Sequence, residues 1–193
     1  PELRRHFEYV VELGAPGVLM CPLIAGFDSM RALAAESGLA VMAHPSMAGP
    51  YVVNEEGGVK HGVLLGNWMR LAGADVSVFP NAGGRFSLSP AECEDIARHL
   101  RKPLGALAPA WPAPAGGMSF DSLPAMVEAY GDDTVVLMGG ALFGQHKDLS
   151  VGTRMFVDAL DDLCSPRYET PQSVEVEPAP AASERCFSFA PGY

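Results

Sequence analysis

The chain has 193 residues, of which 48% are hydrophobic, and its 13 basic and 23 acidic residues give a formal net charge of −10. This length and apolar content suffice for one sizeable domain or a large part of a bigger one, and they exclude a disordered protein. The acidic excess argues against general nucleic-acid binding, because neutralising phosphates requires clustered Lys and Arg.

The apolar runs are too short for a membrane span. Gly and Pro interrupt the longest of them well before the roughly 20 residues that a spanning helix needs, and the N-terminal PELRR does not have the pattern of a signal peptide. The four cysteines, at positions 21, 93, 164 and 186, lack CxxC spacing, which indicates neither a zinc site nor a disulfide framework. We therefore expect a cytoplasmic protein with reduced thiols and no membrane association.

The first part of the chain alternates helix-like and strand-like patterns. Residues 1–13 carry apolar positions at helical spacing, and the continuous apolar run 17–21 (GVLMC) predicts a buried strand. Residues 27–37 predict a helix with Gly38 as its C-terminal cap, and a second buried strand follows at 39–43 (LAVMA).

The same alternation continues through the middle of the chain. Residues 61–71 predict a helix, and residues 75–79 (DVSVF) predict a third strand. The clearest local signature comes next, because Ser89, Pro90 and Glu92 combine an N-cap serine, a first-turn proline and a glutamate able to bond back to the cap.

The last predicted elements follow a proline-rich stretch. Residues 104–115 are apolar and end in WPAPA, residues 121–130 predict a helix that stops at Gly131, and residues 134–138 (TVVLM) predict a β-branched strand. Residues 149–163 predict an amphipathic helix. About five strand-then-helix units with continuously apolar strands predict a parallel α/β sheet, covered by helices on at least one face.

The end of the chain has a different composition. Residues 164–193 are rich in Pro, Ala and Glu and cannot bury enough surface to order themselves. We expect a domain over 1–163 and a flexible tail over 164–193.

Two glycine pairs suggest a phosphate site. Gly116-Gly117 and Gly139-Gly140 each follow a short apolar stretch and precede a helix-like segment. Without a Cβ the backbone can approach an anion closely, and the free N–H groups at the start of the next helix point toward it. The alternative is that the pairs simply make tight turns after strands.

The order of several motifs resembles the C-terminal barrel of the RuBisCO large subunit, and more closely the RuBisCO-like proteins. The resemblance covers about residues 1–163 and is carried by AHPSMAG at 43–49, HGVLLG at 61–66, LAGAD at 71–75, FPNAGGRF at 79–86, PAPAGGM at 112–118 and YGDDTVVLMGG at 130–140. It implies a TIM-type (β/α)₈ barrel, of which the five predicted strands would be the fourth to the eighth. The barrel would therefore be incomplete in this chain.

The resemblance also implies a metal that this chain does not hold. The family's Lys-x-Asp-Glu segment, with its carbamylated lysine, belongs to a strand before this region, and no such segment occurs in the 193 residues. Mg²⁺ is therefore expected in a full-length parent, with its ligands outside this chain.

Two residues are candidates for chemistry. His44 directly follows a predicted strand, where an imidazole can act as an acid or base, and it matches an active-site histidine of the family; the alternative is a histidine merely hydrogen-bonded at a strand end. Arg85 follows the flexible stretch 81–84 and matches the mobile loop that carries a catalytic lysine in RuBisCO; the alternative is a surface arginine.

Three departures from RuBisCO affect one of its two phosphate sites. Pro45 replaces a phosphate-binding arginine, Val78 replaces a histidine, and Ala115 replaces a serine. The site around the glycine pairs is kept. This asymmetry favours a sugar monophosphate over ribulose bisphosphate.

The resemblance implies a RuBisCO-like enzyme that enolises a phosphorylated keto-sugar with the help of Mg²⁺, as a methylthioribulose-phosphate type isomerase or enolase. One alternative is a catalytically silent fragment or binding half that lacks the metal site. A further one is a ribulose-bisphosphate carboxylase or a sugar-phosphate decarboxylase. The expected partners are a small phosphorylated sugar and further copies of the parent in a homodimer or higher oligomer, and neither nucleic acid nor membrane.

Overall fold

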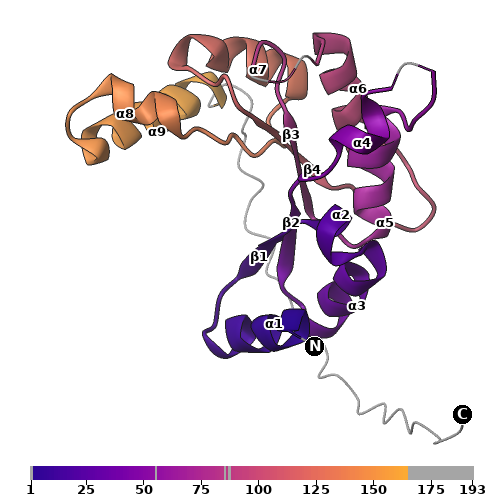
Figure 1. Ribbon diagram of the computed structural model, residues 1–193. Coiled ribbons are helices and arrows are strands. Elements are labelled where there is room, and N and C mark those ends of the chain that lie inside the picture. The colour runs from indigo at the N-terminus through magenta and orange to yellow at the C-terminus, as the bar shows by residue number, and fades with distance from the viewer. Residues whose placement is uncertain (1, 55, 85, 87, 165–193) are drawn as a thin grey trace, which may run out of the picture.

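The computed structural model describes residues 2–54, 56–84, 86 and 88–164 (Figure 1). Its centre is one parallel sheet with the strand order β1-β2-β3-β4. The strands are β1 (Gly17–Met20), β2 (Ala40–Ala43), β3 (Val76–Pro80) and β4 (Trp111–Ala115). The carboxyl ends of all four strands therefore lie along one edge of the sheet.

Helices connect the strands and continue after them. They are α1 (Glu2–Glu12), α2 (Pro22–Ala25), α3 (Phe27–Ser37), α4 (Gly49–Val52), the π-helix η1 (Gly62–Trp68), α5 (Met69–Leu71), α6 (Pro90–Arg101), the 3₁₀-helix η2 (Phe120–Ser122), α7 (Leu123–Tyr130), α8 (Gly140–Gln145) and α9 (Leu149–Cys164). Within the described residues, no helix is long and apolar enough to cross a membrane. The predicted α/β class with parallel strands is confirmed.

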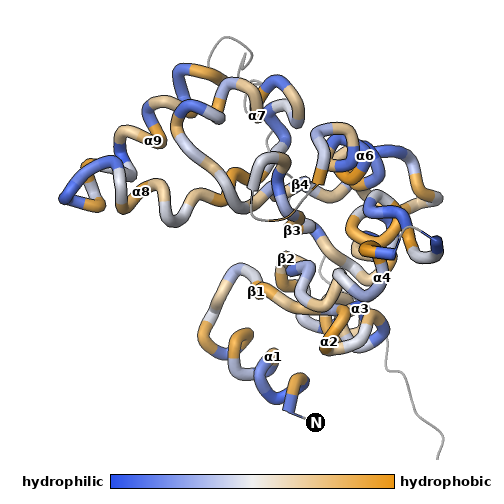
Figure 2. The backbone as a smooth tube through the Cα atoms, turned by 45° about the horizontal axis from the view of Figure 1, so that its top comes forward, coloured by the Kyte–Doolittle hydropathy of each residue, from blue (hydrophilic) through white to orange (hydrophobic). Residues whose placement is uncertain are grey.

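Helices cover one face of the sheet. In Figure 1, α3, α5 and α6 lie on the same side of the strands, and the core between them contains Met30, Val41, Leu64, Phe79 and Ile96, all fully buried. Figure 2 shows hydrophobic and hydrophilic residues alternating along α1 and α9, as expected for amphipathic helices.

The other face of the sheet is more open. Paired residues in a parallel sheet share a face, and the register aligns Leu19 with Met42, Met42 with Val76, and Val76 with Trp111. Leu19 and Trp111, in the two outer strands of this row, are 57% and 50% exposed. In a closed barrel this face would point toward the axis and be filled by side chains.

Two predicted helix ends are confirmed in detail. The Ser89 hydroxyl oxygen accepts a hydrogen bond of 3.3 Å from the N–H of Glu92, and the Glu92 carboxylate accepts one of 2.8 Å from the N–H of Ser89. The hydrogen bonds that the N–H and the hydroxyl of Ser89 donate to the Glu92 carboxylate lower the pKa of that carboxyl group. At the end of α3, Gly38 adopts the left-handed conformation, with φ of 65°, and its N–H donates to Ala34.

The helix predicted over 61–71 begins as a π-helix and lies very close to α6. A Cβ added to Gly66 would stand 2.5 Å from Cβ of His99, so no side chain fits at this position. The absence of a side chain at Gly66 allows the two helix backbones to approach.

The prediction of a regular fifth strand at 134–138 was wrong. This segment runs beside β4, but it forms one isolated parallel bridge, between Ala115 and Leu137, and its Val135 N–H donates to the Pro112 carbonyl at 2.9 Å. The prolines of β4 explain the interruption. The Trp111 N–H donates to the Asp75 carbonyl beside β3, so the backbone polar groups of residue 111 point toward β3. Those of residues 112 and 114 point the other way, toward the segment 134–138, and both residues are prolines, which have no N–H to donate.

Two predicted features fall outside the described residues. They are Arg85 and, apart from Cys164, the tail predicted at 164–193. Cys164 itself is the last residue of α9.

Candidate functional site

The loops that follow the strands carry the predicted site residues to one edge of the sheet. His44 comes directly after β2, Asn81 after β3, and Gly116 after β4. In parallel α/β folds, the carboxyl ends of the strands are where ligand-binding loops gather. The sheet therefore positions His44 and the first glycine pair on the same edge.

His44 is held at this edge through its backbone and its ring. Its N–H donates to the Met20 carbonyl at 2.7 Å, which continues the pairing of β2 with β1 by one residue. Its Nδ1 accepts a hydrogen bond of 3.2 Å from the N–H of Ser46 and lies 2.9 Å from the Ser46 hydroxyl oxygen. The ring is half-buried, and its orientation is defined by these contacts.

The loop after β3 touches the first glycine pair. A Cβ added to Gly117 would stand 2.8 Å from Cα of Gly84, and one added to Gly84 would stand 3.1 Å from the carbonyl oxygen of Gly116. Gly116 and Gly117 also have left-handed φ angles of 85° and 67°. The two loops therefore meet backbone against backbone, which only glycines allow at these positions.

Asn81 connects these loops, and sequence reasoning missed this role. Its side chain is buried; Oδ1 accepts a hydrogen bond of 2.8 Å from the Tyr130 hydroxyl, and Nδ2 donates to Sδ of Met118 at 3.5 Å. Its backbone N–H donates to Ala115 at 2.9 Å, and its carbonyl accepts the Gly84 N–H at 3.2 Å. The available signal was an amide residue placed directly after a buried strand and before a glycine pair.

Tyr130 supports Asn81 from the end of α7. Burial raises the pKa of its hydroxyl far above the usual tyrosine range, and the neighbouring Cys93 raises it further, so the group stays protonated and can donate. Its ring packs edge-on against Phe79, with centroids 5.9 Å apart. Burial likewise raises the pKa of the Cys93 thiol, which donates to the Pro80 carbonyl.

The second glycine pair is open to solvent. Gly139 and Gly140 are exposed, and a Cβ added to either would meet no atom within 4 Å. The bridge between Ala115 and Leu137 places the segment that leads into this pair beside the end of β4. The two glycine pairs therefore follow neighbouring segments at the same edge of the sheet.

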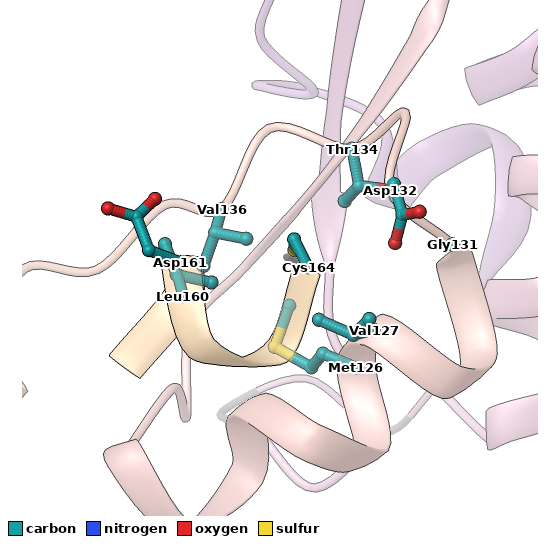
Figure 3. Close-up of a pocket in the computed structure, with 9 residues that line it drawn as sticks. All are labelled: Met126, Val127, Gly131, Asp132, Thr134, Val136, Leu160, Asp161 and Cys164. Atoms are coloured by element: carbon teal, nitrogen blue, oxygen red, sulfur yellow. The ribbon is translucent and has the colours of Figure 1, made fainter. Parts of the chain in front are cut away.

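A cavity of about 210 Å³ lies between α7 and α9, away from the loops that follow the strands. Figure 3 shows the carboxylates of Asp132 and Asp161 on opposite sides of it, with Cys164 and Met126 between them. The other lining residues are Val127, Gly131, Thr134, Val136 and Leu160. Because it is lined by apolar groups and two carboxylates and by no basic side chain, this cavity does not suit a phosphate.

The described residues do not fit the Mg²⁺ that the resemblance implies. Over residues 2–54, 56–84, 86 and 88–164, no three His, Cys, Asp or Glu side chains gather as they would around a metal ion.

Comparisons with known proteins agree on one family. No protein-family model matches the chain. The 5-methylthioribulose-1-phosphate isomerase of Rhodospirillum rubrum is 36% identical over 165 residues, which cover 85% of this chain and 42% of the relative. The 2,3-diketo-5-methylthiopentyl-1-phosphate enolase of Geobacillus kaustophilus is 33% identical over 185 residues, which cover 95% of this chain and 45% of the relative.

A solved structure shows the same fold. The crystal structure of a RuBisCO-like protein from Rhodopseudomonas palustris matches with a TM-score of 0.71 at 33% identity, over 88% of this chain and 43% of that chain. The chain thus spans less than half the length of the relatives that it matches, and its sheet is part of a barrel. It belongs to the family of the RuBisCO large subunit and the RuBisCO-like proteins, and it corresponds to their C-terminal portion.

Proposed function

We propose that this chain forms the phosphate-binding part of a RuBisCO-like enzyme that enolises a phosphorylated keto-sugar. The observation that carries the proposal is the backbone contact between the loop after β3 and Gly116-Gly117, on the sheet edge that also holds His44. Two relatives, named as an isomerase and an enolase of methylthiopentose phosphates, support the same chemical class.

The glycine pairs would bind the phosphate through their backbone. All four glycines are exposed, and the space next to Gly116, Gly139 and Gly140 is free of other atoms of the chain. A phosphate oxygen could therefore approach these N–H groups without meeting a side chain. Arg85 follows Gly84 directly in the sequence, and we assign it as the cation that closes over the bound anion.

His44 would contact the reacting end of the sugar. Enolisation removes a proton next to a carbonyl and places negative charge on its oxygen, so a hydrogen-bonding group at that oxygen lowers the barrier. Mg²⁺, which would stabilise the same charge, would have its ligands outside the described residues. The contribution assigned to this chain is the imidazole of His44 and the binding of the phosphate.

The substrate class that we propose is a keto-sugar monophosphate. Pro45 offers neither a side-chain cation nor an N–H, Val78 is an apolar residue buried in β3, and Ala115 offers no hydroxyl. These three positions give little to a second phosphate, whereas the glycine pairs remain available for the first.

One of the two alternatives keeps support from a particular observation. A binding half without catalysis is favoured by the absence of any metal-binding cluster among the described residues. A ribulose-bisphosphate carboxylase or a sugar-phosphate decarboxylase would belong to the same family, but the three departures at one phosphate site favour neither.

The test combines binding with isotope exchange. Calorimetry with a keto-pentose monophosphate, with ribulose bisphosphate and with inorganic phosphate should give the highest affinity for the monophosphate; tighter binding of the bisphosphate would contradict the substrate assignment. NMR in D₂O with Mg²⁺ added then measures whether the chain exchanges the proton next to the carbonyl. Exchange catalysed by this chain would contradict the silent binding half.

A further inference from the structure

Ser46 offers two hydrogen-bonding groups to one nitrogen of His44. Its backbone N–H donates to Nδ1 at 3.2 Å, and its hydroxyl oxygen lies 2.9 Å from the same atom. A backbone N–H can only donate, so Nδ1 must accept and cannot carry a proton. The proton of the neutral imidazole then has to be on Nε2.

We infer that Ser46 is a positioning residue that holds His44 in the tautomer with its proton on Nε2, so that His44 offers a hydrogen-bond donor at the carboxyl edge of the sheet. This inference rests on the proposed function for its catalytic meaning, but the tautomer is a property of the chain itself. Neither the names of the relatives nor the motif match distinguishes a donor from a base at this position.

The backbone explains why the N–H of Ser46 reaches the ring. His44 is fixed by its bond to Met20, and the Ala48 N–H donates to the Pro45 carbonyl at 3.0 Å, which closes a tight turn over 45–48. Within this turn Met47 has a φ of 70°, an uncommon value for a residue with a side chain. The turn folds the chain back so that the residue two positions after His44 meets its Nδ1.

The consequence concerns the role of His44. With Nδ1 engaged by Ser46 and the proton on Nε2, the neutral ring cannot take a proton at Nε2. It can donate a hydrogen bond from Nε2 to an oxygen of the ligand, which stabilises charge that develops there without any net transfer of a proton. His44 thus acts as a donor toward the enediolate oxygen, and the group that removes the carbon-bound proton has to be another one.

Two other histidines of the chain, His146 and His6, serve as comparisons for His44. Nδ1 of His146 lies 3.0 Å from the N–H of Asp148, which can only donate, but it also lies 3.2 Å from the Asp148 carbonyl oxygen, which can only accept. His6 is exposed on α1. We therefore expect the Nε2–H tautomer at His44, whereas His146 and His6, whose contacts do not select one tautomer, should show a mixture.

The experiment reads the tautomer directly. The chain labelled with ¹⁵N is measured by long-range ¹H–¹⁵N correlation at about pH 8.5, where a free histidine, with a pKa near 6.5, is neutral. For His44, Nδ1 should give the signal of an unprotonated ring nitrogen and Nε2 that of a protonated one. A protonated Nδ1, or a mixture equal to that of His6, would overturn the inference.

A variant and a ligand complete the test. Ser46→Ala removes the hydroxyl and keeps the N–H, so we expect the Nε2–H form to stay dominant while the affinity for a keto-pentose monophosphate falls a few-fold. The melting temperature should lie within about 2 °C of that of the control Ser150→Ala. If the ligand shifts no Nε2 signal in the unchanged chain although calorimetry shows binding, the donor role fails. If calorimetry shows no binding, the proposed function fails and the NMR spectrum alone decides the tautomer.

Discussion

The hydroxyl of Tyr130 donates a hydrogen bond of 2.8 Å to Oδ1 of Asn81, a residue 49 positions earlier in the chain. This bond ties the last residue of α7 to the first residue of the loop after β3. Because the Asn81 carbonyl also accepts the Gly84 N–H, the bond fixes the base of the loop that touches the first glycine pair. A contact inside the core thus controls the geometry of the loops that we propose to bind the phosphate.

Replacing Tyr130 by Phe should loosen this loop while the core stays packed. The ring contact with Phe79 remains, but Oδ1 of Asn81 loses its donor in a buried place, which costs about 1–3 kcal/mol of unfolding free energy. Amide hydrogen exchange at Gly84 should accelerate more than exchange in β1. The exposed Tyr9→Phe serves as the control, and equal exchange at Gly84 in both variants would contradict the anchoring role.

The same tyrosine should make the protein sensitive to alkali. Its pKa is raised by burial above the value near 10 of the unfolded chain, so the folded state binds this proton more tightly. The stabilisation is complete below about pH 10 and is lost as the pH rises toward the pKa of the folded state. Denaturant titrations from pH 8 to 11 should show stability falling above pH 10, and Tyr130→Phe should have a smaller slope there.

Cys93 should react far more slowly than Cys21. Burial raises the pKa of the Cys93 thiol, and its side chain is fully buried, whereas Cys21 is partly exposed. Since the thiolate is the reactive form, a thiol reagent at pH 8 should modify Cys21 at least about ten-fold faster under native conditions. Comparable rates, measured by mass spectrometry of peptides after quenching, would show that α6 opens readily from the sheet.

Local signals predicted most of the elements of this fold. The capping box of Ser89 and Glu92, the cap at Gly38 and the first three apolar runs each depend on residues close together in the sequence, and each is present in the structure. The failure at 134–138 has a different cause. That segment has good strand composition, but a ladder also needs donors from its neighbour, and the prolines at 112 and 114 have none.

The site was predictable only in part for a related reason. His44 and the glycine pairs are marked by their positions after apolar runs, so order along the chain was enough to find them. The partnership of Asn81 with Tyr130 depends on how α7 packs against β3, and nothing in the residues around Asn81 indicates its distant donor. Contacts of this kind follow from tertiary packing and not from a local pattern.

Pro114→Val should extend the sheet toward the segment 134–138. The N–H of Val135 already donates to the Pro112 carbonyl, and in a parallel ladder the next bond would run from residue 114 to the Val135 carbonyl. The variant supplies that missing N–H. We expect the new amide at position 114 to be protected from hydrogen exchange about as strongly as the Ala113 amide; rapid exchange would mean that the prolines are not the cause of the interruption.

Gly66→Ala should destabilise the protein by about 1–3 kcal/mol, the usual cost of forcing extra atoms into a packed place. The added methyl group would stand 2.5 Å from Cβ of His99 and would push η1 away from α6. Gly57→Ala is the matched control, because Gly57 has no left-handed φ and no neighbour within 4 Å of an added Cβ. Equal unfolding free energies for the two variants, from urea titrations, would contradict this account of the helix contact.

Gly140→Val tests the proposed phosphate site without disturbing the fold. Gly140 has no left-handed φ, and an added Cβ meets no atom within 4 Å, so the new side chain enters only the space that a bound anion would occupy. We expect the melting temperature to stay close to that of Gly57→Val, a change at another open glycine, while the affinity for a keto-pentose monophosphate falls at least about ten-fold, or 1.4 kcal/mol. Calorimetry and thermal unfolding measure the two quantities separately. Unchanged affinity would reduce the second glycine pair to a turn, and the phosphate would then have to be bound by Gly116-Gly117 and the loop after β3 alone.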